Sequence, residues 1–251
     1  MAFTTIDNPE LYFQTKLYTG TGSSHAITLD GSENMQPDWV WIKRRNSAGG
    51  HMLTDVIRGV TKTIITNETG AEQTFSNGLT AFGSDGFTVG SEDGFNASSD
   101  TFVAWNWKAG TSFSNDASST GVGSLDSSGS KNTTAGFSII SFTGTESGTP
   151  SIAHGLSSTP EFIISKARDV SDNWMVFHGS FSAQEYISLN STGAKASASS
   201  VWNSLPSSTV INMGDNAGVN DDGAMIMYAF NSVQGFSKFG SYTGNGNADG
   251  T

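Results

Sequence analysis

The chain has 251 residues, a formal net charge of −11 and no cysteine. The lack of cysteine excludes disulfide bonds and thiolate metal sites, and the acidic balance argues against a phosphate-binding surface, so nucleic acid is not an expected partner. Met1 to Asp7 lack the basic and apolar regions of a secretory leader, and no run reaches the ~18 apolar residues that a membrane span needs, so we expect neither a cleaved leader nor membrane insertion. Thirty glycines and 11% aromatic residues favour an all-β protein.

In chain order, a polar lead-in at residues 1–11 is followed by alternating apolar and polar residues from Tyr12 to Tyr18, which predict a half-buried strand. A turn at residues 19–24 separates it from a short strand at residues 25–29. Pro37 opens the most apolar strand of this region, which turns back through residues 44–50 into a strand at residues 51–56. Further strands are expected near residues 63–66, 79–82, 87–90 and 101–108.

A short motif, an aromatic residue followed by Thr-Gly, occurs three times, at Tyr18-Thr19-Gly20, Phe142-Thr143-Gly144 and Tyr242-Thr243-Gly244. We call it the aromatic-Thr-Gly motif. The predicted strands after its second copy follow those after its first copy at a spacing of 123 to 125 residues. Self-similarity at a fixed period indicates repeated structural units. The sequence therefore predicts two tandem β-sandwich domains, lectin-like or jelly-roll-like, that arose by internal duplication.

These repeats define five segments: a lead-in at residues 1–11, the first sandwich at 12–109, a linker at 110–135, the second sandwich at 136–234 and an orphan strand at 235–251. The segment 110–135 is rich in Ser, Gly, Thr and Asn, and this composition is typical of a linker or an exposed loop. A lone strand cannot fold by itself. The orphan strand is therefore expected at the edge of a sheet, in the same subunit or in the next, or as the start of a truncated repeat.

Five segments of the first unit and several of the second resemble a domain family in virion proteins of marine tailed phages, especially those of cyanobacteria and pelagic bacteria. In the first unit they are Tyr18 to Gly22, Pro37 to Lys43, Asp55 to Gly59, Ser84 to Gly90 and Val103 to Ala109. In the second unit they include His154 to Leu156, Pro160 to Ile164, Val201 to Asn203 and Gly235 to Gly244. The resemblance implies a structural or fibre-like virion component with a lectin-like sandwich fold, and it carries over no catalytic residues.

Two Asx-rich loops offer oxygen ligands of the kind that calcium prefers. Neither loop has the spacing of a known calcium loop, and Asx residues also stabilise turns through bonds to their own backbone. Turn formation is the commoner role, so no cofactor is expected, and Ca²⁺ is kept as the alternative. The candidate ligands are Asp93, Asn96, Asp100, Asp215, Asn220 and Asp222.

Four tryptophans form two pairs with a spacing of two, Trp39 with Trp41 and Trp105 with Trp107. Residues two apart in a strand face the same side of a sheet. An exposed pair would form an aromatic platform for a sugar ring, whereas a buried pair would pack a core. Packing is the default, because exposed apolar patches are scarce on soluble proteins.

No pair of a nucleophile and a base, no Glu-x-x-His spacing and no Gly-x-Ser-x-Gly elbow is identifiable. The sequence therefore predicts a non-enzymatic protein on the exterior of a phage particle, made in the host cytoplasm, as a tail fibre, an appendage or a capsid decoration. Its expected partners are further copies of itself, for example in a trimer, other virion proteins and a host-surface glycan or receptor. The alternative is a carbohydrate-binding lectin or a carbohydrate-active hydrolase, because carboxylate separation is a property of the folded chain.

Overall fold

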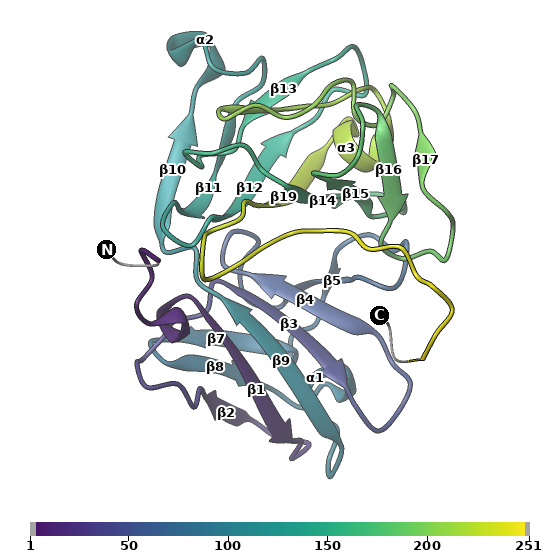
Figure 1. Ribbon diagram of the computed structural model, residues 1–251. Helices are drawn as coiled ribbons and strands as arrows, with labels where there is room; N and C mark the ends of the chain where they lie inside the picture. The colour runs from purple at the N-terminus through teal and green to yellow at the C-terminus, as the bar shows by residue number, and fades with distance from the viewer. Residues whose placement is uncertain (1–3, 249–251) are drawn as a thin grey trace.

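The computed structural model describes residues 4–248. The protein is all-β and has two halves (Figure 1). The first half holds an antiparallel six-stranded sheet and a three-stranded sheet. The large sheet has the order β1 (Phe13–Thr19), β9 (Thr101–Trp107), β3 (Trp39–Arg44), β4 (His51–Asp55), β5 (Lys62–Ile65), β6 (Gln73–Thr74). The small sheet has the order β2 (His25–Thr28), β8 (Gly86–Val89), β7 (Leu79–Gly83). A short 3₁₀ helix, η1 (Pro9–Leu11), precedes β1, and α1 (Asp93–Asn96) precedes β9.

The second half holds an eight-stranded sheet and a two-stranded sheet. The large sheet has the order β10 (Thr111–Asn115), β11 (Ser127–Asn132), β12 (Phe137–Thr143), β19 (Ala224–Phe230), β14 (Phe162–Ala167), β15 (Met175–His178), β16 (Glu185–Ser188), β17 (Ala196–Ser197). The small sheet pairs β13 (Ser151–Ala153) with β18 (Val210–Asn212). Two short helices complete this half, α2 (Ala117–Thr120) and α3 (Ala217–Asn220).

Three apolar clusters hold these sheets together in a β-sandwich arrangement. One lies between the sheets of the first half and includes Val40 and Phe102, and one lies between those of the second half and includes Ile152 and Met227. The third cluster joins the two large sheets and contains Trp39, Leu53, Trp174, Tyr228 and Phe230. The two halves therefore share a core. Figure 1 shows the large sheets facing each other and the small sheets on the outer sides.

The local pattern of each strand follows from which of its faces are covered. In β9 the buried residues alternate with half-buried ones, as expected for a strand whose second face is only partly covered. In β19 six of the seven residues are buried, and the strand is apolar almost throughout. A strand covered on both faces can be apolar throughout, because neither face meets water.

The predicted repetition of strand order is present in the structure. The order β1-β9-β3-β4-β5-β6 of the first half recurs as β12-β19-β14-β15-β16-β17 in the second half. The pairing of β2 with β8 likewise recurs as the pairing of β13 with β18. The all-β prediction is confirmed, and the origin of the halves by duplication stays a prediction.

The predicted linker at 110–135 is wrong, because this segment forms β10, α2 and β11 and extends the second large sheet. A few apolar side chains suffice here, since the ladder between β11 and β12 is made by the backbone. Gly129 favours a close approach: a Cβ at this position would lie 1.9 Å from the carbonyl oxygen of Ile139. A polar, glycine-containing strand can therefore add to the edge of a sheet without a core of its own.

The predicted C-terminal edge strand is also wrong for the described part of its range, residues 235–248, which contains no strand; residues 249–251 lie outside the described residues. The first two copies of the aromatic-Thr-Gly motif end strands that pair with β9 and β19. Both of those strands already have two neighbours, so the third copy has no equivalent partner within this chain. Phe239 instead stacks on Phe162 at 5.5 Å, and Tyr242 is 94% exposed.

Candidate functional site

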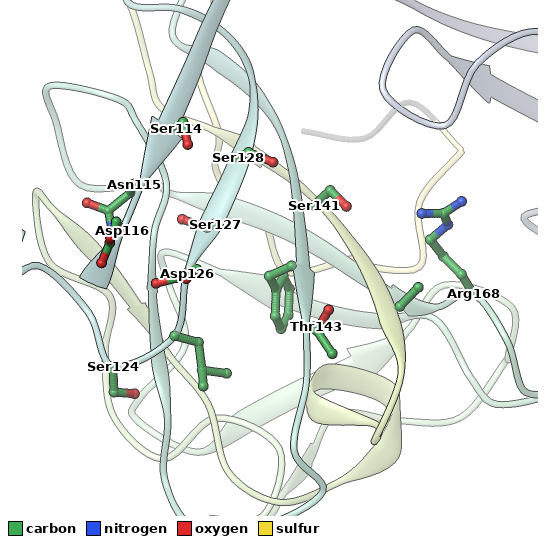
Figure 2. A pocket seen from close by; sticks show the side chains of 13 residues that line it. Ser114, Asn115, Asp116, Ser124, Asp126, Ser127, Ser128, Ser141, Thr143 and Arg168 are labelled. Carbon is green, nitrogen blue, oxygen red and sulfur yellow. The ribbon is translucent and has the colours of Figure 1, made fainter. Parts of the chain in front are cut away.

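A polar groove of about 780 Å³ lies on the second half, where β10 and β12 end and β11 begins (Figure 2). Hydroxyl groups dominate its labelled side chains, from Ser114, Ser124, Ser127, Ser128, Ser141 and Thr143. Asp116 and Asp126 lie on one side of this view and Arg168 lies on the other. The groove therefore combines neutral hydrogen-bonding groups with ionisable groups at its two sides.

The acidic side of the groove is shaped by the loop around α2. Asp116 is the N-cap of α2, and its carboxylate accepts hydrogen bonds from the Ser119 amide at 3.0 Å and the Ser118 hydroxyl at 2.7 Å. These bonds lower the pKa of Asp116. Asp126 Oδ1 accepts a hydrogen bond from the Ala117 amide at 2.8 Å. Both carboxylates thus fix the loop, and a side chain at an N-cap is a common way to begin a helix.

The basic side of the groove is fixed by the other half of the protein. Arg168 donates two hydrogen bonds of 3.0 Å to the carboxylate of Glu72, which lies in the first half. The amide of Glu72 also donates to the carbonyl oxygen of Arg168 at 2.8 Å. A bidentate guanidinium–carboxylate pair holds its geometry more firmly than a single contact. Arg168 is therefore placed at the groove by the contact between the halves.

The chemistry of the groove suits a polyhydroxylated ligand. Hydroxyl side chains both donate and accept hydrogen bonds, and the carboxylates accept them. Phe142 and Leu125 add apolar surface to the lining. A few polar groups around an apolar surface are typical of sites that orient small molecules.

The four predicted aromatic site residues are placed differently from one another. Trp39 is 2% exposed in the shared core, where its ring lies 4.6 Å from that of Trp107. Trp41 and Trp105 are half-buried with their rings 5.7 Å apart, and Trp41 Nε1 donates to the Thr66 hydroxyl. Trp39 is therefore a packing residue and cannot belong to an exposed sugar platform.

Trp39, Trp41 and Trp107 line a second, apolar cavity of about 340 Å³ between the two large sheets. Trp105 is not among its lining residues. The segment from Phe236 to Phe239 lies along this cavity, and its two aromatic rings pack against both halves: Phe236 lies 6.1 Å from Tyr12, and Phe239 lies on Phe162. The paired tryptophans thus serve the junction between the halves.

Two of the predicted calcium ligands, Asn96 and Asn220, occupy equivalent positions at the ends of α1 and α3 and are fully buried. Asn96 Oδ1 accepts from the Thr21 amide at 2.8 Å, and its Nδ2 donates to the carbonyl oxygens of Ser23 and Gly90. Each asparagine therefore holds the turn that follows one copy of the aromatic-Thr-Gly motif. We call these two arrangements the asparagine clamps.

The second clamp repeats the first. Asn220 Oδ1 accepts from the Thr145 amide at 2.9 Å, and its Nδ2 donates to the carbonyl oxygens of Ser147 and Gly214. The glycine of each motif lies tightly against the clamp, since a Cβ on Gly20 or Gly144 would lie 2.1 Å from a backbone oxygen. The glycine of the third motif is not packed in this way, since a Cβ on Gly244 would meet nothing within 4 Å.

The remaining predicted ligands are not brought together. Asp93, Asp215 and Asp222 are exposed, and the carboxylate of Asp100 lies 3.2 Å from Arg44. Across residues 4–248, no group of three or more His, Asp or Glu side chains could hold a metal ion. The calcium site stays a prediction, although the amide oxygens of both asparagines already accept backbone hydrogen bonds.

Most residues that line the polar groove lie in the segment 110–135, for which the sequence predicts a linker, and none of the lining residues is among the predicted site residues. Two signals in the sequence could have revealed it. Asp116 before Ala117-Ser118-Ser119 is a helix N-cap pattern, and the serines at 128 and 130 alternate with glycine, as in a strand. No helix of the described chain is long and apolar enough to cross a membrane.

Comparison with known proteins places the chain in a family. Residues 8–251 match the family described as a domain of unknown function, DUF7483. The chain belongs to this family. The match spans both halves. Neither a curated protein nor a solved structure matches the chain.

Proposed function

We propose that this DUF7483 protein is a non-enzymatic structural component of the exterior of a tailed-phage virion, which assembles as a homo-oligomer and binds a host-surface glycan through the polar groove. The location rests on the resemblance to virion proteins carried by segments such as Pro37 to Lys43. The glycan-binding part is carried by one observation, the row of hydroxyl side chains that lines the groove.

The surroundings of the groove support this proposal. The strands beneath it belong to the eight-stranded sheet, and the shared core and the Arg168–Glu72 pair tie that sheet to the first half. Rigid strands position binding side chains more reliably than mobile loops. Neutral hydroxyl groups also suit the neutral hydroxyls of a sugar better than they suit a charged partner.

A glycan array with the labelled protein tests the binding role. We expect binding to a subset of bacterial surface glycans, weakened at least about tenfold by Ser128→Trp, since an indole at this exposed position would fill the groove. Ser47→Trp, at an exposed turn of the first half, is the matched control and should bind as the wild type does. Equal binding by both variants, or no binding by the wild type, would contradict the groove as the glycan site.

The location is tested separately, on intact particles. We expect gold-labelled antibodies against the protein to decorate the outside of purified virions, and mass spectrometry to detect the chain in them. Cryo-electron microscopy of the same particles would assign the density to a fibre, an appendage or a capsid decoration. Virions that lack the protein would overturn the structural role and leave glycan binding to be judged from the array.

A hydrolase is the second candidate, because Asp116 and Asp126 lie in one groove. Glycoside hydrolysis by paired carboxylates needs one of them protonated as the acid. The lowered pKa of Asp116 favours its ionised form, which opposes the acid role for that residue. Turnover of host polysaccharide that is abolished by Asp126→Asn or Asp116→Asn alone would favour the enzyme over the structural protein.

A further inference from the structure

The outer edge of β1 is an unpaired strand edge among the described residues. β1 is the first strand of the six-stranded sheet, and it pairs only with β9. At the two ends of this ladder, the Lys108 amide donates to the Tyr12 carbonyl oxygen and the Gly20 amide donates to the Asp100 carbonyl oxygen. In an antiparallel pair, residues that bond to the neighbour alternate with residues that do not. The even-numbered residues of β1 therefore bond to β9.

It follows that the backbone N–H and C=O groups of the odd-numbered residues point to the open edge. These residues are Phe13, Thr15, Leu17 and Thr19. Within residues 4–248, no loop or side chain forms a hydrogen bond with their main chain. A row of unpaired backbone groups on a seven-residue strand is a template for pairing with another strand.

In the second half, the edge equivalent to that of β1 is paired with another strand, β11. The strand β12 corresponds to β1, and the Gly144 amide donates to the Gly223 carbonyl oxygen, so its even-numbered residues bond toward β19. Its odd-numbered residues from Phe137 to Ser141 bond toward β11. The first half has no counterpart of β10 and β11 in the described chain. The outer edge of β1 is therefore unpaired, whereas the equivalent edge of β12 is paired with β11.

The open edge has no proline, and its one charged residue is already paired. Natural edge strands are commonly blunted by charge, proline or a bulge. Here Thr15 and Thr19 are exposed and uncharged, and Leu17 is 55% exposed. The one charged residue of the strand, Lys16, projects from the other face of the sheet and pairs with Asp30.

We propose that β1 pairs antiparallel with β1 of a second copy of this chain about a two-fold axis, so that two six-stranded sheets become one. The chemistry favours a second copy: the exposed side chains of the edge, Thr15, Leu17 and Thr19, are uncharged, so two chains of net charge −11 can meet there without bringing carboxylates together. A two-fold contact closes on itself and uses the same surface on both copies.

The register follows from the position of the axis. With the axis at Lys16, Thr15 lies opposite the Leu17 of the second copy and Phe13 lies opposite its Thr19, so all four open residues form hydrogen-bonded pairs. Each Lys16 keeps its own Asp30, which reduces the repulsion between the two ammonium groups. This inference rests on the homo-oligomer of the proposed function and assigns the surface that forms it, as a dimer rather than a trimer.

Sedimentation of the full chain tests the pairing, with Thr15→Pro against Thr15→Val. Proline removes a backbone donor that faces the open edge, and it leaves the β1–β9 ladder intact, because Thr15 does not bond to β9. We expect a wild-type dimer, a similar dimer for Thr15→Val, and at least about a tenfold weaker dimer for Thr15→Pro. Thermal melting checks that the proline variant is folded. A dimer of unchanged affinity in the folded proline variant overturns the proposal.

Hydrogen exchange and cross-linking give two independent readouts. We expect the amides of Thr15 and Leu17 to become protected as the protein concentration rises. Because the chain has no cysteine, Thr15→Cys and Leu17→Cys chains can be mixed, and they should form a disulfide-linked pair across the interface. An oligomer with unprotected β1 amides and no cross-link overturns the pairing alone, whereas a monomer at all concentrations overturns the homo-oligomer of the proposed function as well.

Discussion

The hydroxyl of Tyr228 donates a 2.7 Å hydrogen bond to Asp55 Oδ2, and this bond joins two residues that are 173 positions apart. Both residues are fully buried, and Arg58 Nε donates to the same carboxylate oxygen at 2.6 Å. Asp55 and Arg58 come from the first half and Tyr228 from the second. A buried ion pair thus lies directly at the junction of the halves.

Tyr228→Phe should destabilise the protein by about 1.5–3 kcal/mol, because a charged, buried acceptor loses one hydrogen bond. Urea denaturation gives the free energy of unfolding. Tyr186→Phe is the control. This tyrosine is half-buried and packs on the apolar cluster between the sheets of the second half, and the substitution likewise removes a hydroxyl and keeps the ring. If the two variants were equally stable, the Tyr228–Asp55 bond would have no role in joining the halves.

Asn96→Ala and Asn220→Ala should each lower the free energy of unfolding by about 1–3 kcal/mol, because buried backbone groups lose their partners. We also expect faster hydrogen exchange at the Thr21 amide in the first variant and at the Thr145 amide in the second. The effect should stay within one clamp. Faster exchange at both amides in either variant would argue against two separate clamps.

Gly144→Ala should cost about 3 kcal/mol or more, because the new methyl group would overlap the backbone oxygen of Asp221. Gly244→Ala is the matched control in the third motif, where a Cβ meets nothing within 4 Å, and its effect on stability should be small. Thermal and chemical denaturation of both variants measure the difference. Similar losses would mean that the third motif is clamped as the first two are.

Removal of divalent cations should leave the midpoint of thermal unfolding unchanged. The amide oxygens of Asn96 and Asn220 already accept backbone hydrogen bonds, so a calcium ion at either loop would have to compete with the clamp. Differential scanning calorimetry in EDTA and in calcium tests this. A midpoint raised by calcium in the wild type but not in Asn220→Ala would restore the calcium site.

The buried imidazole of His154 should make stability depend on pH. Burial, with a smaller effect of Lys131, lowers the pKa of His154 to about 4 from 6.5. Its Nδ1 accepts from the Leu156 amide, which leaves Nε2 to donate to the Ser207 carbonyl oxygen. The unfolded chain therefore binds the proton first, and the free energy of unfolding falls as the pH drops from 6.5 toward 4, by about 1.4 kcal/mol per unit.

The measurement is urea denaturation of the wild type and His154→Gln across this pH range. The variant should lose part of the pH dependence, and His178→Gln, which removes a half-buried histidine, should keep it. Since carboxylates also titrate near pH 4, the comparison is made between variants. Parallel pH profiles for all three proteins would show that His154 does not carry the effect.

Local patterns in the sequence predicted the strands of the first half closely. The strand β1 ends at the aromatic-Thr-Gly motif, and the apolar run after Pro37 forms β3. These elements follow from alternation, turn residues and proline, which act over a few residues. The 123-to-125-residue spacing also predicted the strand order of one half from the other, because equivalent residues meet equivalent neighbours in both.

The polar groove could not be predicted from the sequence, for a physical reason. The segment 110–135 has too few apolar residues to bury a core, and this composition is typical of a linker. A strand such as β11 needs no core of its own, since the backbone of β12 supplies its hydrogen bonds. Whether an edge is available depends on the folded sheet, which composition does not describe.

The three copies of the aromatic-Thr-Gly motif show what the sequence determines and what only the tertiary structure decides. The sequence by itself determined the all-β class, the strand at each of the first two motifs and the repeated order, because these depend on local periodicity and on similarity along the chain. Only the tertiary structure decided that the third motif forms no strand within the described residues. A strand at this motif would need a free edge of a strand such as β9 or β19 and an asparagine such as Asn96 or Asn220. The first two motifs, which lie far away in the sequence, already pair with these strands and asparagines.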